Sequence, residues 1–347
     1  MSTALNMAFS IGDWLVTRRM KHMIVHVTTA CNFRCEHCFI DFESEKRDLK
    51  LSHFQKLGAQ SPPLMWLDIG GGEPFLRKDL ADIVLSFDSQ IVHIPTNGSL
   101  IPQMIEQVKK IQENSTREII IGLSLDGLEK NHNLIRKEND SWNQVWDAYK
   151  ALRELGNVSI KVCTVINNKN IDDIIPLMEE VQKRGVDFHS VILLRGATLD
   201  PSITLPSLDQ LKALGPKMFE ILGRYDYGRS KLSAYILQNF HRMLWNTSLK
   251  TIEQQTQVIP CLAGQTQLVV WGDGKVGACE MLPSVGDLLE KDLPDIIASD
   301  AWKEQLQFIK DKKCHCTHNC AMLDSIFYNP VNLPSLLHQK IPYQKIT

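Results

Sequence analysis

The sequence predicts an α/β protein in which six parallel strands curl into a partial (β/α)6 barrel, followed by a smaller cysteine-rich α+β domain. Between residues 23 and 195, short apolar runs alternate with longer segments of helical periodicity. Each intervening segment is long enough for a right-handed strand–helix–strand crossover, which favours parallel strands. After residue 195 this alternation stops, and five of the nine cysteines follow residue 260. These two changes of pattern predict two parts of different architecture.

Six apolar runs are the predicted strands, and four helix-period segments are the predicted crossovers. The strands are expected at Met23–Thr28, Leu64–Ile69, Ile91–Pro95, Ile119–Leu125, Val158–Ile166 and Ser190–Leu194. The helices are expected near Leu80–Phe87, Ile101–Glu113, Trp142–Leu155 and Ile171–Arg184. The crossover between the first two strands has no clear helical pattern. In barrels of this kind, functional residues gather where strands end and loops begin.

The C-terminal part has a different sequence pattern. Helical segments are predicted around Leu208–Leu222 and Leu232–Leu249, after a proline-bearing loop. Gly272-Asp273-Gly274 is typical of a hairpin turn between Gln267–Trp271 and Lys275–Cys279. The predicted organisation is an N-terminal extension (1–22), the barrel (23–200), a helical linker (201–250), and a cysteine-rich domain with its tail (251–347).

Composition excludes several classes of protein. Lysine and arginine number 38 against 40 aspartates and glutamates, so there is no basic excess for binding nucleic acid. No apolar run approaches the ~18 residues that a membrane-spanning helix needs. The positive charges near the N-terminus follow an apolar stretch, whereas a secretory signal has them in front. We therefore expect a cytoplasmic protein with no nucleic-acid or membrane partner, and cysteines that serve metal or redox chemistry.

The first cysteine group directly follows the first predicted strand. Cys31, Cys35 and Cys38 form a CxxxCxxC pattern in the loop at the strand's C-terminal end. Three thiolates hold a cubane iron–sulfur cluster by three irons and leave the fourth iron open to a substrate or cofactor. The alternative is a structural zinc site, which needs a fourth ligand, and His26 and His37 are the nearest candidates.

Together with Gly70-Gly71-Gly72-Glu73-Pro74 after the second strand, this motif resembles the radical S-adenosylmethionine enzymes. The resemblance implies a TIM-like partial barrel and a [4Fe-4S] cluster with S-adenosylmethionine at its open iron. It implies that the GGEP segment (Gly71, Gly72, Glu73 and Pro74) meets the amino group of the methionine part. Further cofactor-binding positions implied by the family are His37, Asn97, Ser124, Asp126, Asn167 and Arg195. Taken singly, most of these residues are also ordinary turn formers.

The second cysteine group also resembles a part of this superfamily. Cys261, twelve residues, Gly274, four residues and Cys279 match the opening of the C-terminal SPASM and twitch extensions, which hold auxiliary clusters. Five cysteines rather than seven imply one auxiliary iron–sulfur cluster, of the [4Fe-4S] type. The implied ligands are Cys261, Cys279, Cys320 and either Cys314 or Cys316. The alternative is a zinc knuckle that uses His315 or His318.

One cysteine lies outside both groups. Cys163 falls inside a predicted strand, where it is either a small buried hydrophobic residue or a thiol that donates a hydrogen atom. Cys314 is a second candidate for such a catalytic thiol if Cys316 is the ligand.

The resemblance implies an enzyme that reductively cleaves S-adenosylmethionine to a 5′-deoxyadenosyl radical, which abstracts a hydrogen atom from substrate. It also implies a reductant such as flavodoxin or ferredoxin. Since 22 residues precede the first strand, we expect a small-molecule natural-product intermediate as substrate rather than a peptide. A fully ligated auxiliary cluster favours oxidation, by dehydrogenation or cross-linking. The alternatives are a redox-neutral epimerase, a ribosomal-peptide maturase, and a zinc-binding interaction module without enzymatic activity.

Overall fold

The fold is described from a computed structural model, in which residues 3–40 and 48–337 are placed. The extreme ends of the predicted extension and tail, and part of the first crossover, lie outside the described residues. Across the described residues, no helix combines the length and the apolar character needed to cross a bilayer.

The prediction of six parallel strands in a barrel-like sheet is confirmed. Strands β1 to β6 pair in sequence order, each parallel to the next. Their bounds are β1 His22–His26, β2 Leu64–Gly70, β3 Ser89–Thr96, β4 Glu118–Ser124, β5 Ser159–Ile166 and β6 Phe188–Leu193. Because β6 does not pair with β1, the barrel stays open on one side.

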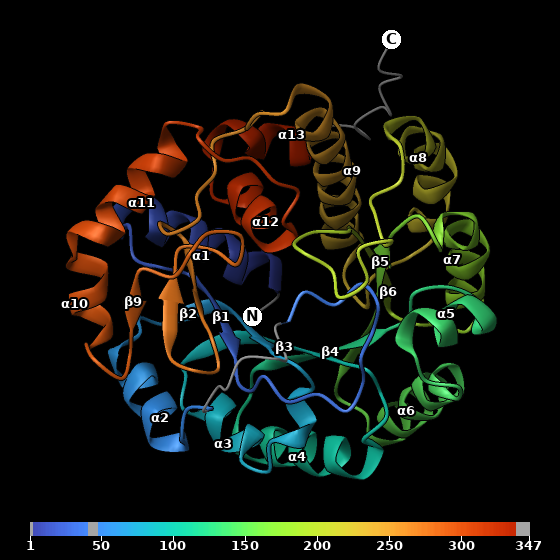
Figure 1. The fold of residues 1–347 in the computed structure, drawn as a ribbon, viewed down its shortest axis with the longest axis horizontal. Coiled ribbons are helices and arrows are strands. Elements are labelled where there is room, and N and C mark those ends of the chain that lie inside the picture. Colours follow the sequence, from blue (N-terminus) through green and yellow to red (C-terminus); the bar gives the residue numbers. More distant parts are fainter. Residues whose placement is uncertain (1–2, 41–47, 338–347) are drawn as a thin grey trace.

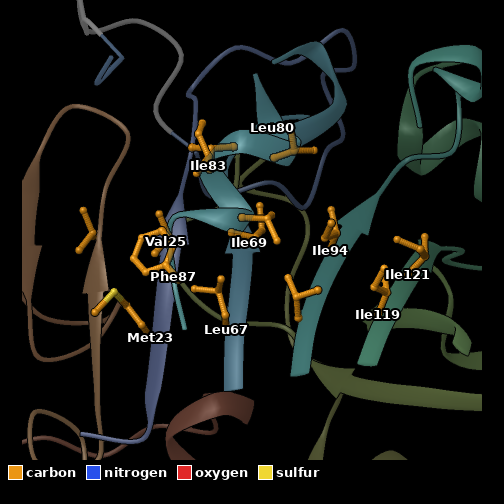
Figure 2. Packing of buried hydrophobic residues seen from close by; sticks show 14 of the residues in the cluster. Met23, Val25, Leu67, Ile69, Leu80, Ile83, Phe87, Ile94, Ile119 and Ile121 are labelled. Carbon is orange, nitrogen blue, oxygen red and sulfur yellow. The ribbon is translucent and has the colours of Figure 1, made fainter. Parts of the chain in front are cut away.

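Helices surround the outside of this sheet, as Figure 1 shows. Those that connect the barrel strands are α2 Leu51–Gln60, α3 Leu80–Leu85, α4 Ile101–Asn114, α5 Glu129–Arg136, α6 Ser141–Leu155 and α7 Ile174–Lys183, with 3-10 turns at Pro74–Leu76 and Ile171–Asp173. Figure 2 shows how apolar residues of successive strands, such as Met23, Leu67 and Ile94, pack against Leu80 and Ile83 of α3 and against Phe87, which follows this helix. Side chains alternate across a strand, so the intervening residues face the barrel interior.

The helices after residue 290 were not predicted, and three of the described helices before residue 200 were not predicted either. These three are α1 (Thr3–Thr17), α2 and α5. In α5 the buried residues include His132 and Arg136, so the face that it buries is largely polar and has no apolar stripe to reveal it. Figure 1 shows α1 packed beside β2 at the edge of the barrel.

The C-terminal part extends the same sheet. The predicted hairpin is present as β7 (Gln267–Val270) and β8 (Lys275–Gly277), and β9 (Gly286–Asp287) follows it. Strand β7 lies parallel to β1 on the side away from β2. The remaining helices are α8 Leu208–Leu222, α9 Lys231–Gln254, α10 Leu293–Ala298, α11 Asp300–Lys310, α12 Asn319–Phe327 and α13 Leu333–Leu337, with a 3-10 turn at Pro330–Asn332. Figure 1 places α9 and α12 on the open side of the barrel.

Candidate active site

A cavity of about 310 Å³ occupies the barrel interior and is closed on one side by α12. Residues of all six barrel strands line it, together with the first cysteine loop and the start of α12. Most of the predicted site residues share this lining, namely Cys31, Cys35, His37, Cys38, Gly71, Gly72, Glu73, Asn97, Ser124, Cys163, Arg195 and Cys320. The fold therefore collects residues from nearly the whole length of the chain around one space.

The three thiols of the first group gather at one end of this cavity. Burial raises the pKa of Cys31 to about 11 and also raises the pKa values of Cys35 and Cys38. Bound iron stabilises the thiolate form, so a cluster would offset this effect. The guanidinium of Arg136 donates to the Cys35 Sγ at 3.6 Å. These three thiols and their surroundings therefore fit a cluster held by three cysteines.

The two histidines considered as a fourth zinc ligand face other groups. The Nε2 of His26 lies 2.8 Å from a Glu280 oxygen, and its ring stacks on Trp271 with centroids 4.3 Å apart. The Nε2 of His37 lies 3.7 Å from an Asp126 oxygen, and burial lowers the pKa of this imidazole to about 4. His37 thus lines the cavity as a neutral ring.

The glycines of the GGEP segment permit a close backbone approach. A Cβ on Gly72 would stand 2.1 Å from the carbonyl oxygen of Ala30 and 2.9 Å from the Cβ of Cys31. Gly71 has a φ of +128° and its Cβ would meet the Thr28 oxygen at 2.4 Å. Only glycine fits between the end of β2 and the cysteine loop, so this segment fixes the position of the first thiol.

Glu73 lies at the centre of a hydrogen-bond network. Its carboxylate accepts from the backbone N–H groups of Phe75 (3.2 Å) and Asn97 (2.8 Å) and from the Thr96 hydroxyl (2.9 Å). Burial raises the pKa of Glu73 to about 7, although these three hydrogen bonds oppose the rise. The carboxylate thus joins the ends of β2 and β3 and lines the cavity.

Three predicted cofactor-binding residues do not line the cavity. Pro74 is buried at the start of the 3-10 turn, and Asn167 accepts from the backbone of Lys169 within its own loop. Asp126 is fully buried and forms an ion pair with Arg136, which holds the pKa of this carboxyl below its usual value against the effect of burial. Their side chains shape the loops around the site.

Four of the five late cysteines gather beside the β7–β8 hairpin. The side-chain amide of Gln257 accepts from the backbone N–H of Cys261 at 3.3 Å and donates to the Cys314 carbonyl at 2.9 Å, which holds those two segments together. Burial raises the pKa of Cys261 to about 11 and that of Cys279 to about 12, and the negative charge of Cys316 adds to both rises. Cys261, Cys279, Cys314 and Cys316 thus form one group.

Cys320 lies elsewhere, although the resemblance assigned it to the second cluster. It is the second residue of α12, whose first turn faces the barrel, and its Sγ lies 3.5 Å from an Asp68 oxygen in the cavity. Its charged neighbours are Asp68, Glu280 and Arg195 rather than other thiols. The expected pairing of Cys320 with Cys261 and Cys279 therefore differs from the observed geometry.

Cys163 also faces the cavity, and it pairs with Ser124 on the neighbouring strand, close to Gly122. A Cβ on Gly122 would meet the Nε2 of His93 at 2.6 Å and the Sγ of Cys163 at 3.1 Å. The absence of a side chain there leaves room for both groups.

Several cavity residues escaped the sequence analysis. Asp68 and His93 are joined by a hydrogen bond of 2.6 Å, and Lys161 lines the same wall. Glu280 is buried and contacts His26, Arg195 and His318. The sequence did contain one signal. Asp68 lies in an otherwise apolar strand, and a buried carboxylate needs hydrogen-bond or ion-pair partners.

Comparison with known protein families gives two matches. Residues 25–181 match the radical SAM superfamily, and residues 261–321 match SPASM, an iron–sulfur cluster-binding domain. These domains imply that the protein binds iron–sulfur clusters and S-adenosylmethionine.

Curated relatives are similar over part of their length. GTP 3′,8-cyclase 2 of Pseudomonas aeruginosa is 28% identical over 57% of this chain and 62% of its own. Fe-coproporphyrin III synthase of Methanosarcina barkeri is 28% identical over 51% of this chain and 46% of its own. The uncharacterised protein MJ0907 of Methanocaldococcus jannaschii is 28% identical over 59% and 72%. The chain therefore spans about half to three-quarters of these relatives.

Solved structures share the fold. anSMEcpe with bound AdoMet has a TM-score of 0.59 at 15% identity and covers 91% of this chain and 95% of its own. Streptococcus suis SuiB bound to its precursor peptide SuiA has a TM-score of 0.62 at 14% identity, covering 88% and 70%. The motifs, the cavity and the two domain matches agree, and this chain belongs to the radical SAM superfamily, with a SPASM domain after its radical SAM domain.

Proposed function

We propose that the protein cleaves S-adenosylmethionine reductively and abstracts a hydrogen atom from a substrate held in the barrel cavity. The observation that carries this proposal is the arrangement of Cys31, Cys35 and Cys38 at one end of that cavity, with Gly72 packed against their loop. A cluster held there by three thiolates supplies the electron that breaks the sulfonium bond.

In this proposal the chain's own residues bind S-adenosylmethionine and orient it. The Glu73 carboxylate and the backbone beside Gly71 and Gly72 receive the methionine ammonium, as charge-assisted acceptors. His37, Asn97, Ser124 and Arg195 line the rest of the cofactor region, and Arg136 neutralises charge beside Cys35. The barrel walls, with α12 over one side of the cavity, exclude water and stray hydrogen donors from the reacting atoms.

We further propose that the second cysteine group holds one [4Fe-4S] cluster with four thiolates, namely Cys261, Cys279, Cys314 and Cys316. A cluster without an open iron relays electrons, and it would accept the electron of a substrate radical. Net oxidation of a small-molecule natural-product intermediate is therefore the favoured reaction.

A second candidate is redox-neutral epimerisation, and the position of Cys163 favours it. The thiol lines the cavity and lies outside both cysteine groups, so it could return a hydrogen atom to a substrate radical. A one-electron reductant such as flavodoxin or ferredoxin would then regenerate the thiol.

Anaerobic reconstitution followed by reaction with dithionite and S-adenosylmethionine tests the proposal. We expect about eight irons per chain, from two cubane clusters, and 5′-deoxyadenosine with methionine as products. A reproducible value near four irons would refute the proposed auxiliary cluster. A reconstituted protein that forms no 5′-deoxyadenosine would refute the proposed function. In D₂O, solvent deuterium at the substrate carbon that disappears in Cys163→Ala, while 5′-deoxyadenosine still forms, would support the epimerase candidate.

Binding of S-adenosylmethionine should depend on pH through Glu73. The pKa of this carboxyl is raised to about 7, so its ionised fraction increases as the pH rises from 5.5 towards 7.5. Because the ionised form accepts the ammonium, we expect the Kd to fall by roughly tenfold per pH unit below the pKa. Calorimetric titration of the reconstituted protein measures this. Glu73→Gln should bind weakly with a flat profile, and an unchanged slope in that variant would contradict the assignment.

A further inference from the structure

Three potential metal ligands from three separate elements converge beside the cavity. The Nε2 of His22 on β1 lies 3.0 Å from an oxygen of Asp68 on β2, and the Sγ of Cys320 on α12 lies 3.5 Å from the same oxygen. These three ligand atoms lie within 4.8 Å of one another. Among the described residues, no other group of histidine, cysteine and carboxylate ligand atoms is so compact.

The spacing of these atoms fits a tetrahedral ion. A zinc ion with Zn–O of about 2.0 Å and Zn–S of about 2.3 Å separates the two ligand atoms by about 3.5 Å. The same geometry separates a nitrogen and an oxygen ligand by about 3.3 Å, close to the 3.0 Å between His22 and Asp68. The ligand atoms are therefore already near the positions that an ion would require.

The residues behind these ligands hold them in orientation. The Nδ1 of His22 lies 3.1 Å from a carboxylate oxygen of Asp324, whose other oxygen accepts from the Thr266 hydroxyl at 2.7 Å. A carboxylate that accepts a hydrogen bond from Nδ1–H leaves Nε2 as the ligand atom, as behind metal-bound histidines, and an ion would replace the proton that Nε2 shares with Asp68.

Asp68 is oriented in the same way. Its second oxygen accepts from the Trp66 indole at 3.1 Å and contacts the Nδ1 of His93 at 2.6 Å. The other oxygen, which faces His22 and Cys320, is therefore the one that would bind an ion.

From this geometry we propose that His22, Asp68 and Cys320 bind a single zinc-class divalent ion, separate from both clusters. Nitrogen, oxygen and thiolate ligands together suit zinc, and three protein ligands leave one coordination position open, as in catalytic rather than structural sites. Asp68 and Cys320 line the cavity, so the open position faces it. There the ion would bind a hydroxyl, carbonyl or carboxylate oxygen of the substrate and orient it as a Lewis acid. This site does not depend on the reaction proposed above.

Zinc analysis of the anaerobic holoenzyme tests the site directly. After incubation with zinc and removal of loosely bound ions, we expect about one zinc per chain, with a zinc K-edge spectrum of one sulfur at about 2.3 Å and nitrogen or oxygen at about 2.0 Å. Cys320→Ser and His22→Gln should each lose the zinc during the same removal step, and Asp324→Asn should lower zinc affinity by about 10- to 100-fold. Cys163→Ala, in the same cavity, is the matched control and should retain the zinc.

Iron is measured in every sample to separate this site from the clusters. We expect Cys320→Ser to keep all its iron, which also shows that the variant is folded and loaded. Retention of zinc in Cys320→Ser, a zinc shell made only of sulfur, or less than a tenth of a zinc per chain in the holoenzyme would each overturn the proposal. A loss of about four irons in Cys320→Ser would place this thiol on the auxiliary cluster and overturn it as well.

Discussion

Replacing Cys31, Cys35 and Cys38 together by alanine is expected to abolish reductive cleavage of S-adenosylmethionine. Methyl groups cannot bind iron, so the cluster at the cavity end is lost together with its open iron. We expect 5′-deoxyadenosine, measured by chromatography and mass spectrometry after reaction with dithionite, to fall below detection. The iron content should fall from about eight to about four per chain, because the second group of thiols lies elsewhere in the fold.

The control for this experiment is Cys163→Ala, which removes a cavity thiol outside both cysteine groups. This variant should keep its iron and continue to form 5′-deoxyadenosine. If the triple variant still formed 5′-deoxyadenosine at the rate of the parent protein, the assignment of the first cluster would be refuted.

Arg136→Met should destabilise the protein by about 3–5 kcal/mol, because it leaves the Asp126 carboxylate buried without its partner. Asp126 is fully buried, and the side chain of Arg136 is only 10% exposed. The guanidinium also contacts the Sγ of Cys35, so the variant should take up iron more slowly during reconstitution. Urea unfolding, followed by circular dichroism, measures the change in stability.

Arg153→Met is the matched control for this substitution. Arg153 pairs with Asp187 at 2.8 Å, but about a third of its side chain is exposed, so its loss should cost no more than ~1 kcal/mol. The double variant Arg136→Met/Asp126→Asn should recover much of the lost stability, because it leaves no uncompensated charge. Equal destabilisation by Arg136→Met and Arg153→Met would show that the buried pair is not the cause.

The barrel could be predicted from sequence because each of its strands carries a strong local signal. The runs beginning near Met23, Leu64 and Val158 are apolar and bounded by polar loops, and the structure places strands there to within two residues. Helix α5 carries no such signal, since it buries polar groups. The pairing of β7 with β1 could not be predicted either, because it joins segments that are far apart in the chain.

The candidate site also contains residues that the sequence identified and residues that only the folded structure brings together. Contiguous motifs, together with the family that they resemble, identified the cysteines and the Gly71–Pro74 segment. The place of Cys320 depends on how α12 packs against β1 and β2, and no local pattern specifies that packing. The contacts of Asp68 with His22 and His93 likewise arise only after three strands are side by side.

The parallel pairing of β1 with β7 also bears on how the chain is made. Strand β1 leaves the ribosome early, yet its outer edge pairs with Gln267–Val270, which are synthesised only after most of the chain. At ordinary elongation rates of about 5–20 residues per second, that edge would stay open for roughly ten seconds to a minute. An unpaired apolar edge invites aggregation, so the nascent protein should depend on chaperones during this interval. For the same reason, expression of the barrel without its C-terminal part should give insoluble material rather than an independent domain.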